Sequence, residues 1–190
     1  MVGLLLAAGS ATRFGSDKLR HNLPHGVSIA VQAARHLRPR VSKLIAVVKP
    51  GADELASHLE AEGCEVIVCE NAAEGMGASL ACAARAAGEA DAYLVALGDM
   101  PFVRPSSIAA VRAALESGAV LAAPYFHARR GHPVGIGRRF YPELLRLEGD
   151  QGAKQLIAAN EKILVKVPVG DPGVVRDIDT PQDVAPPLRI

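Results

Sequence analysis

Two cations and a run of small residues lie close together near the N-terminus. Residues 4–18 read LLLAAGSATRFGSDK, where an apolar run ends at Gly9 and is followed by Arg13 and Lys18. Small residues such as Gly9 and Gly15 let backbone N–H groups approach an anion closely, and the two cations offset its charge. The pattern predicts a phosphate-binding loop. The alternative is a tight glycine turn in which Arg13 and Lys18 are ordinary surface charges.

The loop differs from two well-known phosphate-binding motifs. A Walker A loop has four residues between its glycines and then Lys-Ser/Thr, whereas five residues separate Gly9 from Gly15 and Ser16-Asp17 follow. A dinucleotide-binding fingerprint needs glycine where this chain has Ala11 and Phe14. Both of these motifs are therefore excluded.

Carboxylates are the second set of residues that could do chemistry. Asp99 follows the apolar run 93–97, and Asp177 and Asp179 come just past the strand-like pair Val174-Val175. Mg²⁺ binds through one or two carboxylates together with substrate phosphates. Asp99 is therefore a candidate Mg²⁺ ligand, with Asp179 or Asp177 as the second. A turn or helix-cap role for Asp99 is the alternative.

The elements that position these residues alternate between strand and helix in the first part of the chain. Apolar runs typical of buried strands lie at 4–8, 44–48, 66–68 and 93–97, and helical patterns lie at 27–37, 53–62, 78–87 and 105–116. This alternation predicts βαβ units, hence a mostly parallel sheet with helices on both faces. The loops 9–18, 70–77 and 98–101 then meet at the carboxyl rim of the sheet, where ligands bind.

The second part of the chain has a different order of elements. Six residues, 127–132, separate the strand-like runs 120–126 and 133–136, too few for a crossover helix, so these runs should pair antiparallel, with each other or with another strand. Helical patterns at 141–147 and 153–159 and a strand at 163–167 follow. We expect an α/β fold of three layers, with a short antiparallel element, as a single domain over 1–190.

Composition limits the classes of function. The chain has 190 residues, 49% of them apolar, and a net charge of +1, so no general field attracts nucleic acid or an acidic membrane surface. The apolar runs are shorter than the ~20 residues of a membrane span, and no basic leader precedes the first one. We expect a cytoplasmic protein. The odd number of cysteines (Cys64, Cys69, Cys82) and their spacing indicate buried thiols and no disulfide framework or zinc site.

Six motifs occur in order over residues 6–183. They are Leu-Ala-Ala-Gly-x-x-x-Arg-Phe-Gly-x-x-Lys (6–18), Gly-Met-Gly-x-Ser-Leu (75–80), Leu-Gly-Asp-Met-Pro (97–101), Arg-Gly-His-Pro-Val (130–134), Gly-Asp-x-Gly-Ala (149–153) and Asp-Ile-Asp-Thr-Pro-x-Asp (177–183). As a set they resemble the MobA-like nucleotidyltransferases, and most closely the molybdenum cofactor cytidylyltransferase (MocA-like) branch. The resemblance implies a Rossmann-like nucleotidyltransferase fold.

The resemblance also implies an activity and a site. CMP would pass from CTP to a phosphate of molybdopterin, with Mg²⁺ as cofactor and pyrophosphate as the leaving group. The half at about 1–104 would bind the NTP and the half at about 105–185 the acceptor. The implied catalytic residues are Arg13, Lys18 and Asp99, the metal ligands Asp99 and Asp179, the acceptor-binding residues His132 and Asp150, and the nucleotide-binding residues Leu6, Ala7, Ala8, Gly9, Ser10, Arg13, Lys18, Gly75, Gly77, Ser79 and Gly98.

Several of these assignments have structural alternatives. Gly75, Gly77 and Ser79 offer free N–H groups to an anion at a helix start, or they are a plain helix entry. Asp150 orders over the acceptor, or it caps the helix from Ala153. His132 touches the acceptor, or it is a turn histidine bonded to backbone. The pair Arg129-Arg130 meets an acceptor phosphate, or it belongs to a solvated loop.

The function also has alternatives. Ala7-Ala8-Gly9 resembles the CTP-using branch, because the guanylyltransferase branch usually has Ala-Gly-Gly there. Ala11, where many members carry Ser, and the polar stretch 20–24 depart from the family pattern. A molybdopterin guanylyltransferase, or a nucleotidyltransferase for another small phosphorylated acceptor such as a sugar phosphate or phospholactate, is the second hypothesis. A non-catalytic nucleotide-binding partner of a molybdoenzyme is the third.

Overall fold

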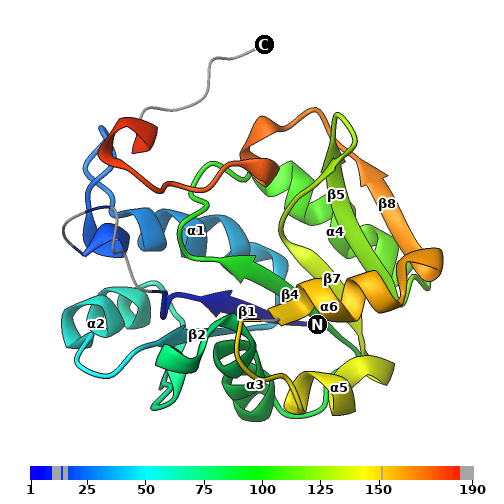
Figure 1. The fold of residues 1–190 in the computed structure, drawn as a ribbon. Coiled ribbons are helices and arrows are strands. Elements are labelled where there is room, and N and C mark those ends of the chain that lie inside the picture. Colours follow the sequence, from blue (N-terminus) through cyan, green and yellow to red (C-terminus); the bar gives the residue numbers. More distant parts are fainter. Residues whose placement is uncertain (10–13, 15–16, 151, 185–190) are drawn as a thin grey trace.

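One sheet runs through the computed structural model, which describes residues 1–9, 14, 17–150 and 152–184 (Figure 1). Its strand order is β3-β2-β1-β4-β7-β5-β6, with β8 on the other side of β5. The strands are β1 (Val2–Leu6), β2 (Lys43–Val48), β3 (Glu65–Val68), β4 (Ala92–Leu97), β5 (Leu121–Phe126), β6 (Arg129–Arg130), β7 (Val134–Gly137) and β8 (Leu164–Pro168). The first four are parallel, as their apolar runs and intervening helices predict.

The helices cover both faces of this sheet. They are α1 (Ile29–Leu37), α2 (Asp53–Ala61), α3 (Met76–Ala87), α4 (Pro105–Glu116), α5 (Tyr141–Leu145) and α6 (Gly152–Ala159). Leu5 of β1 packs into one core with α1, α2 and α4, and its neighbours Leu4 and Leu6 pack into a second core with α3, α5 and α6. Figure 1 shows α1 above β1 and β4, and α3 and α5 below them. The expected three-layer α/β architecture is confirmed.

The antiparallel element expected in the second half lies inside the sheet. β7 pairs antiparallel with β4 on one side and with β5 on the other, in the registers Val95 to Val134 and Leu121 to Ile136. Because β5 is antiparallel to β7, it runs in the same direction as β4, and so does β8. The carboxyl ends of β1, β4, β5 and β8 therefore lie at one rim.

Short 3₁₀ turns connect many of these elements. They are η1 (Lys18–Arg20), η2 (Arg38–Arg40), η3 (Ala72–Glu74), η4 (Arg138–Phe140), η5 (Glu161–Ile163), η6 (Pro172–Val175) and η7 (Pro181–Val184). The expectation that Asp177 and Asp179 follow a strand at Val174-Val175 is wrong, since these valines belong to η6. Asp171 caps that turn and Pro172 occupies its first position, which is a helix-start signal.

In the part of the chain that the structure describes, no helix is long and apolar enough to cross a membrane.

Candidate active site

Hydrogen bonds hold the carboxyl ends of β1, β2 and β4 together beyond the strands themselves. Gly98 donates its N–H to the Leu6 carbonyl at 2.8 Å, and Ala7 donates to the Val47 carbonyl at 2.9 Å. A Cβ on Gly98 would lie 3.1 Å from the Leu6 oxygen, so glycine allows these two chains to approach. Ala7 and Ala8 are buried, and Gly9 is exposed at the rim.

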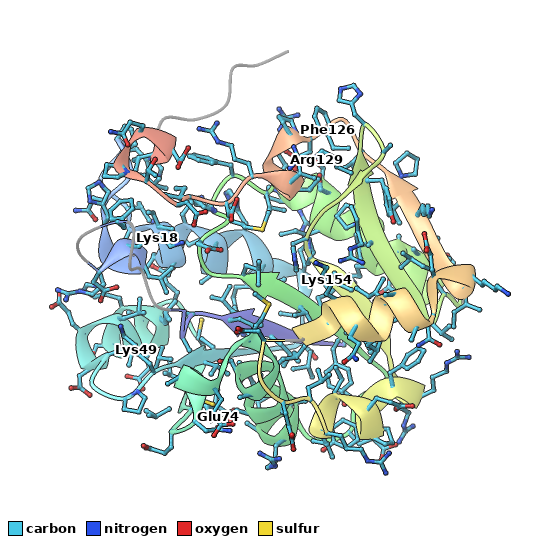
Figure 2. All side chains as sticks on the ribbon, viewed as in Figure 1. Lys18, Lys49, Glu74, Phe126, Arg129 and Lys154 are labelled. Carbon is cyan, nitrogen blue, oxygen red and sulfur yellow. The ribbon has the colours of Figure 1, made fainter. Side chains whose placement is uncertain are left out.

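Lys18 joins two carboxylates that are far apart in the sequence. Its Nζ lies 2.9 Å from Asp99 Oδ2 and 3.4 Å from Asp179 Oδ1. The Lys18 side chain is 11% exposed, whereas those of Asp99 and Asp179 are 25% and 48% exposed. Figure 1 shows the C-terminal segment, in red, returning beside the N-terminal one, in blue, and Figure 2 labels Lys18 on this side of the molecule. The cluster thus combines a covered ammonium group with carboxylates that solvent can reach.

Backbone and side-chain bonds fix the segment that carries Asp179. The Ile178 N–H donates to the Asp99 carbonyl at 3.0 Å, which places the two acidic residues side by side. Asp183 Oδ2 accepts bonds from the Thr180 N–H at 2.8 Å and from the Thr180 hydroxyl at 2.7 Å. These bonds lower the pKa of Asp183, so its carboxylate stays ionised and keeps the turn after Asp179 in place.

A buried carboxylate braces the same region from the other side. Asp171 is buried, and its Oδ2 accepts bonds from the Ser107 hydroxyl at 2.7 Å and from the Arg104 N–H at 2.8 Å. Its Oδ1 accepts a bond from the Gly173 N–H at 2.9 Å. Asp171 therefore links the start of α4, which follows the Asp99 loop, to η6, which leads to Asp179.

The charge state of Lys18 follows from its surroundings. Burial lowers the pKa of the ammonium group, but the neighbouring carboxylates of Asp99 and Asp179 outweigh that effect and raise the pKa above its ordinary value. Lys18 is therefore a cation at physiological pH. Counting one charge for each of the three groups, the cluster carries one net negative charge.

A family comparison identifies this arrangement. The family model described as the MobA-like NTP transferase domain matches residues 3–163. The chain belongs to this family. The match covers β1, β4, Lys18 and Asp99, and it identifies this MobA-like domain as a nucleotidyltransferase.

Two curated proteins show how varied the relatives of this MobA-like domain are. The bifunctional protein GlmU of Xanthobacter autotrophicus is 35% identical over 144 residues, which cover 71% of this chain and 31% of that protein, so this chain spans about a third of its length. Nicotine blue oxidoreductase of Paenarthrobacter nicotinovorans is 25% identical over 189 residues, covering 95% and 92%. Because the names differ in reaction, the substrates of the present domain must be argued from its own site.

The solved structures agree with the fold. The crystal structure of Rv0371c from Mycobacterium tuberculosis matches with a TM-score of 0.81 and 26% identity, covering 96% of this chain and 95% of that one. Another structure of that protein, matching with a TM-score of 0.77, is a complex with manganese.

The donor set of this MobA-like domain suits a hard divalent cation. Asp99 and Asp179 present carboxylate oxygens, the ligand type that Mg²⁺ and Mn²⁺ prefer. Over residues 1–9, 14, 17–150 and 152–184, no group of three or more His, Cys, Asp and Glu side chains is arranged to hold a metal. Two carboxylates fit an ion that takes its remaining ligands from phosphate and water, and they do not fit a closed structural site.

A second cluster forms where α3 begins. The Gly77 N–H donates to the Gly149 carbonyl at 2.6 Å, and a Cβ on Gly77 would lie 2.5 Å from the Glu148 carbonyl oxygen. Gly75 has a φ of +131°, and a Cβ there would collide with Asp150. Close packing of the loop 148–150 therefore accounts for both glycines, and α3 begins at Met76, two residues earlier than expected.

His132 is held inside the fold. The backbone N–H of His132 donates to the Val174 carbonyl at 2.8 Å. The ring Nδ1 is buried and has no hydrogen-bond partner among the described residues. The ring lines a small, mostly apolar cavity with residues of α1, α4 and the loop after β4, including Met100 and Ile108. Burial lowers the pKa of His132 to about 4, so the ring is neutral at physiological pH.

The predicted site residues of this MobA-like domain thus fall into groups. Lys18, Asp99 and Asp179 meet in one cluster, at the rim where Leu6, Ala7, Ala8, Gly9 and Gly98 lie. Gly75, Gly77 and Asp150 meet in the second, with the buried Ser79 hydroxyl donating to the Gly75 carbonyl at 3.3 Å. His132 lies in the interior. Ser10, Arg13 and the departure at Ala11 lie outside the described residues.

Two bracing residues have no role in the sequence-based prediction. Asp183 stands three residues after Thr180, the spacing of a capping box, and Asp171 precedes Pro172-Gly173, a helix-start signal. Both signals can be read from the sequence, but neither says which distant segment the capping carboxylate reaches.

Proposed function

We propose that this nucleotidyltransferase transfers CMP from CTP to a phosphate group of molybdopterin, releasing pyrophosphate, with Mg²⁺ as cofactor. The observation that carries the proposal is the cluster of Lys18, Asp99 and Asp179 at the carboxyl rim of β1 and β4. A cation that reaches phosphate and two carboxylates that suit a divalent ion are the parts that nucleotidyl transfer needs. The order of the six sequence motifs supports the assignment to the cytidylyltransferase branch.

The reaction is a displacement at the α-phosphorus. An oxygen of the acceptor phosphate forms a bond to the α-phosphorus of CTP, and the bond between that phosphorus and the oxygen bridging to the β-phosphate breaks. That oxygen leaves with pyrophosphate. The acceptor phosphate is already ionised, so the reaction needs no nucleophilic side chain and no covalent enzyme intermediate.

The residues of this chain position the reactants and offset their charge. The exposed backbone at Gly9 approaches the phosphates, and Lys18 and Arg13 bind them. Asp99 and Asp179 hold Mg²⁺, whose chemistry when bound is to neutralise the charge that builds on the phosphate oxygens. Leu6, Ala7, Ala8, Ser10, Gly75, Gly77, Ser79 and Gly98 complete the nucleotide site.

The acceptor site lies in the half at about 105–185. Asp150 reaches the nucleotide half because its loop packs on Gly75 and Gly77. His132 contributes as a neutral ring, because its burial excludes a role as a cation for the acceptor phosphate. The two halves act as one domain, since the strands of both belong to one sheet.

A panel of nucleotides tests this function. The purified protein is incubated with Mg²⁺, molybdopterin and CTP, GTP, ATP or UTP in turn, and pyrophosphate release is measured. Turnover with CTP alone is the expected result. Turnover with GTP, or with CTP only when a sugar phosphate or phospholactate replaces molybdopterin, would favour the second hypothesis. Nucleotide binding without turnover under any combination would favour an accessory protein of a molybdoenzyme and would overturn the proposal.

A further inference from the structure

Phosphate binding alone does not explain the position of Lys18. Its Nζ contacts Asp99 Oδ2 at 2.9 Å and Asp179 Oδ1 at 3.4 Å, the two side chains with the donor atoms for a divalent ion. The same group is a cation that a triphosphate at this rim can recruit. A single ammonium group therefore faces two sets of oxygens, those of the protein and those of the nucleotide.

We propose that Lys18 is an exchangeable counter-ion: it occupies the carboxylate pair in the free protein and moves to the phosphates when nucleotide and metal enter together. The inference rests on the proposed function, because it assigns the carboxylate pair to a metal and the Lys18 ammonium to an NTP. It adds a coupling between the two ligands that the proposed function does not require.

Electrostatics favours the position that Lys18 occupies. Asp99 and Asp179 come from segments 80 residues apart, and the bond from the Ile178 N–H to the Asp99 carbonyl holds them beside each other. Two adjacent carboxylates repel, and a covered ammonium group that contacts both of them relieves that repulsion. Lys18 therefore offsets the charge of the carboxylate pair from the position in which the structure holds it.

Lys18 and a metal ion compete for the same oxygen atoms. A metal ion that approaches Asp99 Oδ2 or Asp179 Oδ1 meets oxygens already bonded to Lys18, and it also meets the repulsion of a cation at about 3 Å. A triphosphate removes both obstacles because its oxygens accept the ammonium group. Metal binding should therefore be weak alone and strong with nucleotide, and by linkage each ligand should favour the other.

The position of the side chains agrees with such an exchange. Asp179 and Asp99 are accessible to solvent, so a ligand can reach them from the rim, while the aliphatic stem of Lys18 is covered. Lys18 is also the first residue of the 3₁₀ turn η1. A rotation of its side chain alone can change the oxygens that Nζ contacts, without a change in the sheet.

Manganese binding without turnover tests the exchange. Free Mn²⁺ is measured by electron paramagnetic resonance during titration of the wild type, Lys18→Met and Lys18→Gln, in the absence of nucleotide. Removing the ammonium group should tighten Mn²⁺ binding about tenfold, within the range usual for coupled sites. Lys43→Met is the matched control. Lys43 pairs with Glu65 at 2.8 Å at the amino ends of β2 and β3, so this substitution should leave Mn²⁺ affinity unchanged. Asp99→Asn should weaken binding.

A measurement on the wild type covers the case in which the Lys18 variants do not fold. The ¹⁵N resonance of the Lys18 ammonium group is followed by NMR during addition of Mg²⁺ alone, and then of Mg²⁺ with a non-hydrolysable CTP analogue. The signal should stay in place with Mg²⁺ alone and shift when the analogue is added. Equal Mn²⁺ affinity in all folded lysine variants, or an unmoved resonance with both ligands present, would overturn the exchange.

These outcomes separate the exchange from the proposed function. Turnover of CTP together with unchanged Mn²⁺ affinity in Lys18→Met would leave the function standing and remove the exchange. Tighter Mn²⁺ binding in Lys18→Met, with no turnover of any nucleotide by the wild type, would show competition between Lys18 and metal in a protein that does not catalyse the proposed reaction.

Discussion

Asp99 has two separate contacts, and this allows chemistry to be tested apart from architecture. Its side chain binds Lys18, while its backbone carbonyl accepts the Ile178 N–H. Asp99→Asn removes the charge and keeps the backbone bond. We expect kcat/KM for CTP to fall about 100-fold or more, since a carboxylate proposed to hold the metal ion is lost, with little change in the melting temperature.

The control for this substitution lies at the opposite end of the same strand. Asp91, which precedes β4, has a side chain that is 94% exposed and lies 3.9 Å from Arg138. Asp91→Asn removes an equal charge and should leave pyrophosphate release unchanged. Near-normal release by Asp99→Asn would contradict its assignment as a metal ligand.

Two glycines of the predicted nucleotide site should respond differently to alanine. A Cβ on Gly9 would meet no atom of the described residues within 4 Å, whereas one on Gly77 would press on the Glu148 carbonyl. Gly9→Ala should therefore fold with normal stability and weaken CTP binding, because the methyl group keeps phosphate away from the backbone. Gly77→Ala should lower the free energy of unfolding by about 1–3 kcal/mol, the usual cost of overpacking. Chemical denaturation and nucleotide titration of both variants check this contrast.

The buried His132 ring makes stability depend on pH. Its pKa is about 4 in the fold against an ordinary 6.5, so the unfolded chain takes up the proton first as the pH falls. The stabilisation is complete above pH 6.5 and is lost between about pH 6.5 and 4, by at most about 3 kcal/mol. Urea denaturation at pH 7 and pH 5 should show this loss in the wild type and a smaller loss in His132→Gln. Equal losses in both proteins would exclude His132 as the source.

Residue types and spacing predict the atoms of the main cluster but not their contacts in the free protein. A lysine after a glycine-rich loop, an aspartate after a strand and an Asp-x-Asp pair are visible in the sequence. Lys18 lies 81 positions before Asp99 and 161 positions before Asp179 in the sequence. Their contacts depend on how the chain folds back, and no local sequence pattern encodes that. The packing role of Gly75 and Gly77 is hidden for the same reason, because the loop 148–150 is distant in sequence.

Individual contacts, and not strand pairing, hold the segment 171–184 in place. It has no strand, and it is attached to the rest of the fold through Asp171, through the Ile178 N–H on the Asp99 carbonyl, and through the Val174 carbonyl, which accepts the His132 N–H. Asp171 satisfies donors from Arg104, Ser107 and Gly173 at once. The segment that carries Asp179 therefore owes its position to one buried side chain more than to regular pairing.

Loss of that side chain should affect stability and metal use together. Asp171→Ala leaves three buried or half-buried donors without an acceptor, and we expect the free energy of unfolding to fall by about 3 kcal/mol. Because η6 leads to Asp179, the Mg²⁺ concentration for half-maximal activity should rise more than the KM for CTP. Leu115→Ala, which leaves a cavity in α4 away from the rim, is the control. The same rise in that variant would reduce Asp171 to a structural role.

Regular elements are predictable where pattern and length agree. The parallel strands β1 to β4 and the helix α4 have the expected bounds to within about two residues, because apolar runs and helical periods specify them locally. β6 has two residues and no pattern of its own, and it exists only because it pairs with the end of β5. The 3₁₀ turn η6 contains Val174 and Val175. Because valine is common in strands, the sequence pattern predicts a strand there.

For the molecule as a whole, the sheet separates two apolar cores of similar kind. Leu37 of α1 belongs to the core above β1, and Leu80 of α3 belongs to the core below it; both side chains are fully buried. The sequence predicts this division, because a strand buried on both faces is apolar at every position, as β1 is. It does not predict how the two cores share stability, since that depends on the sheet between them.

Truncation of both leucines tests whether the two cores unfold as one unit. Leu37→Ala and Leu80→Ala should each lower the free energy of unfolding by about 2–5 kcal/mol. Since the sheet keeps the two side chains apart, the double variant should lose the sum to within about 0.5 kcal/mol. The strands of the nucleotide half and of the acceptor half pair through β4 and β7. One transition should therefore be seen both by tyrosine fluorescence and by circular dichroism. Two transitions, each sensitive to one of the substitutions, would mean that the two cores unfold separately, and this would contradict a single cooperative domain over 1–190.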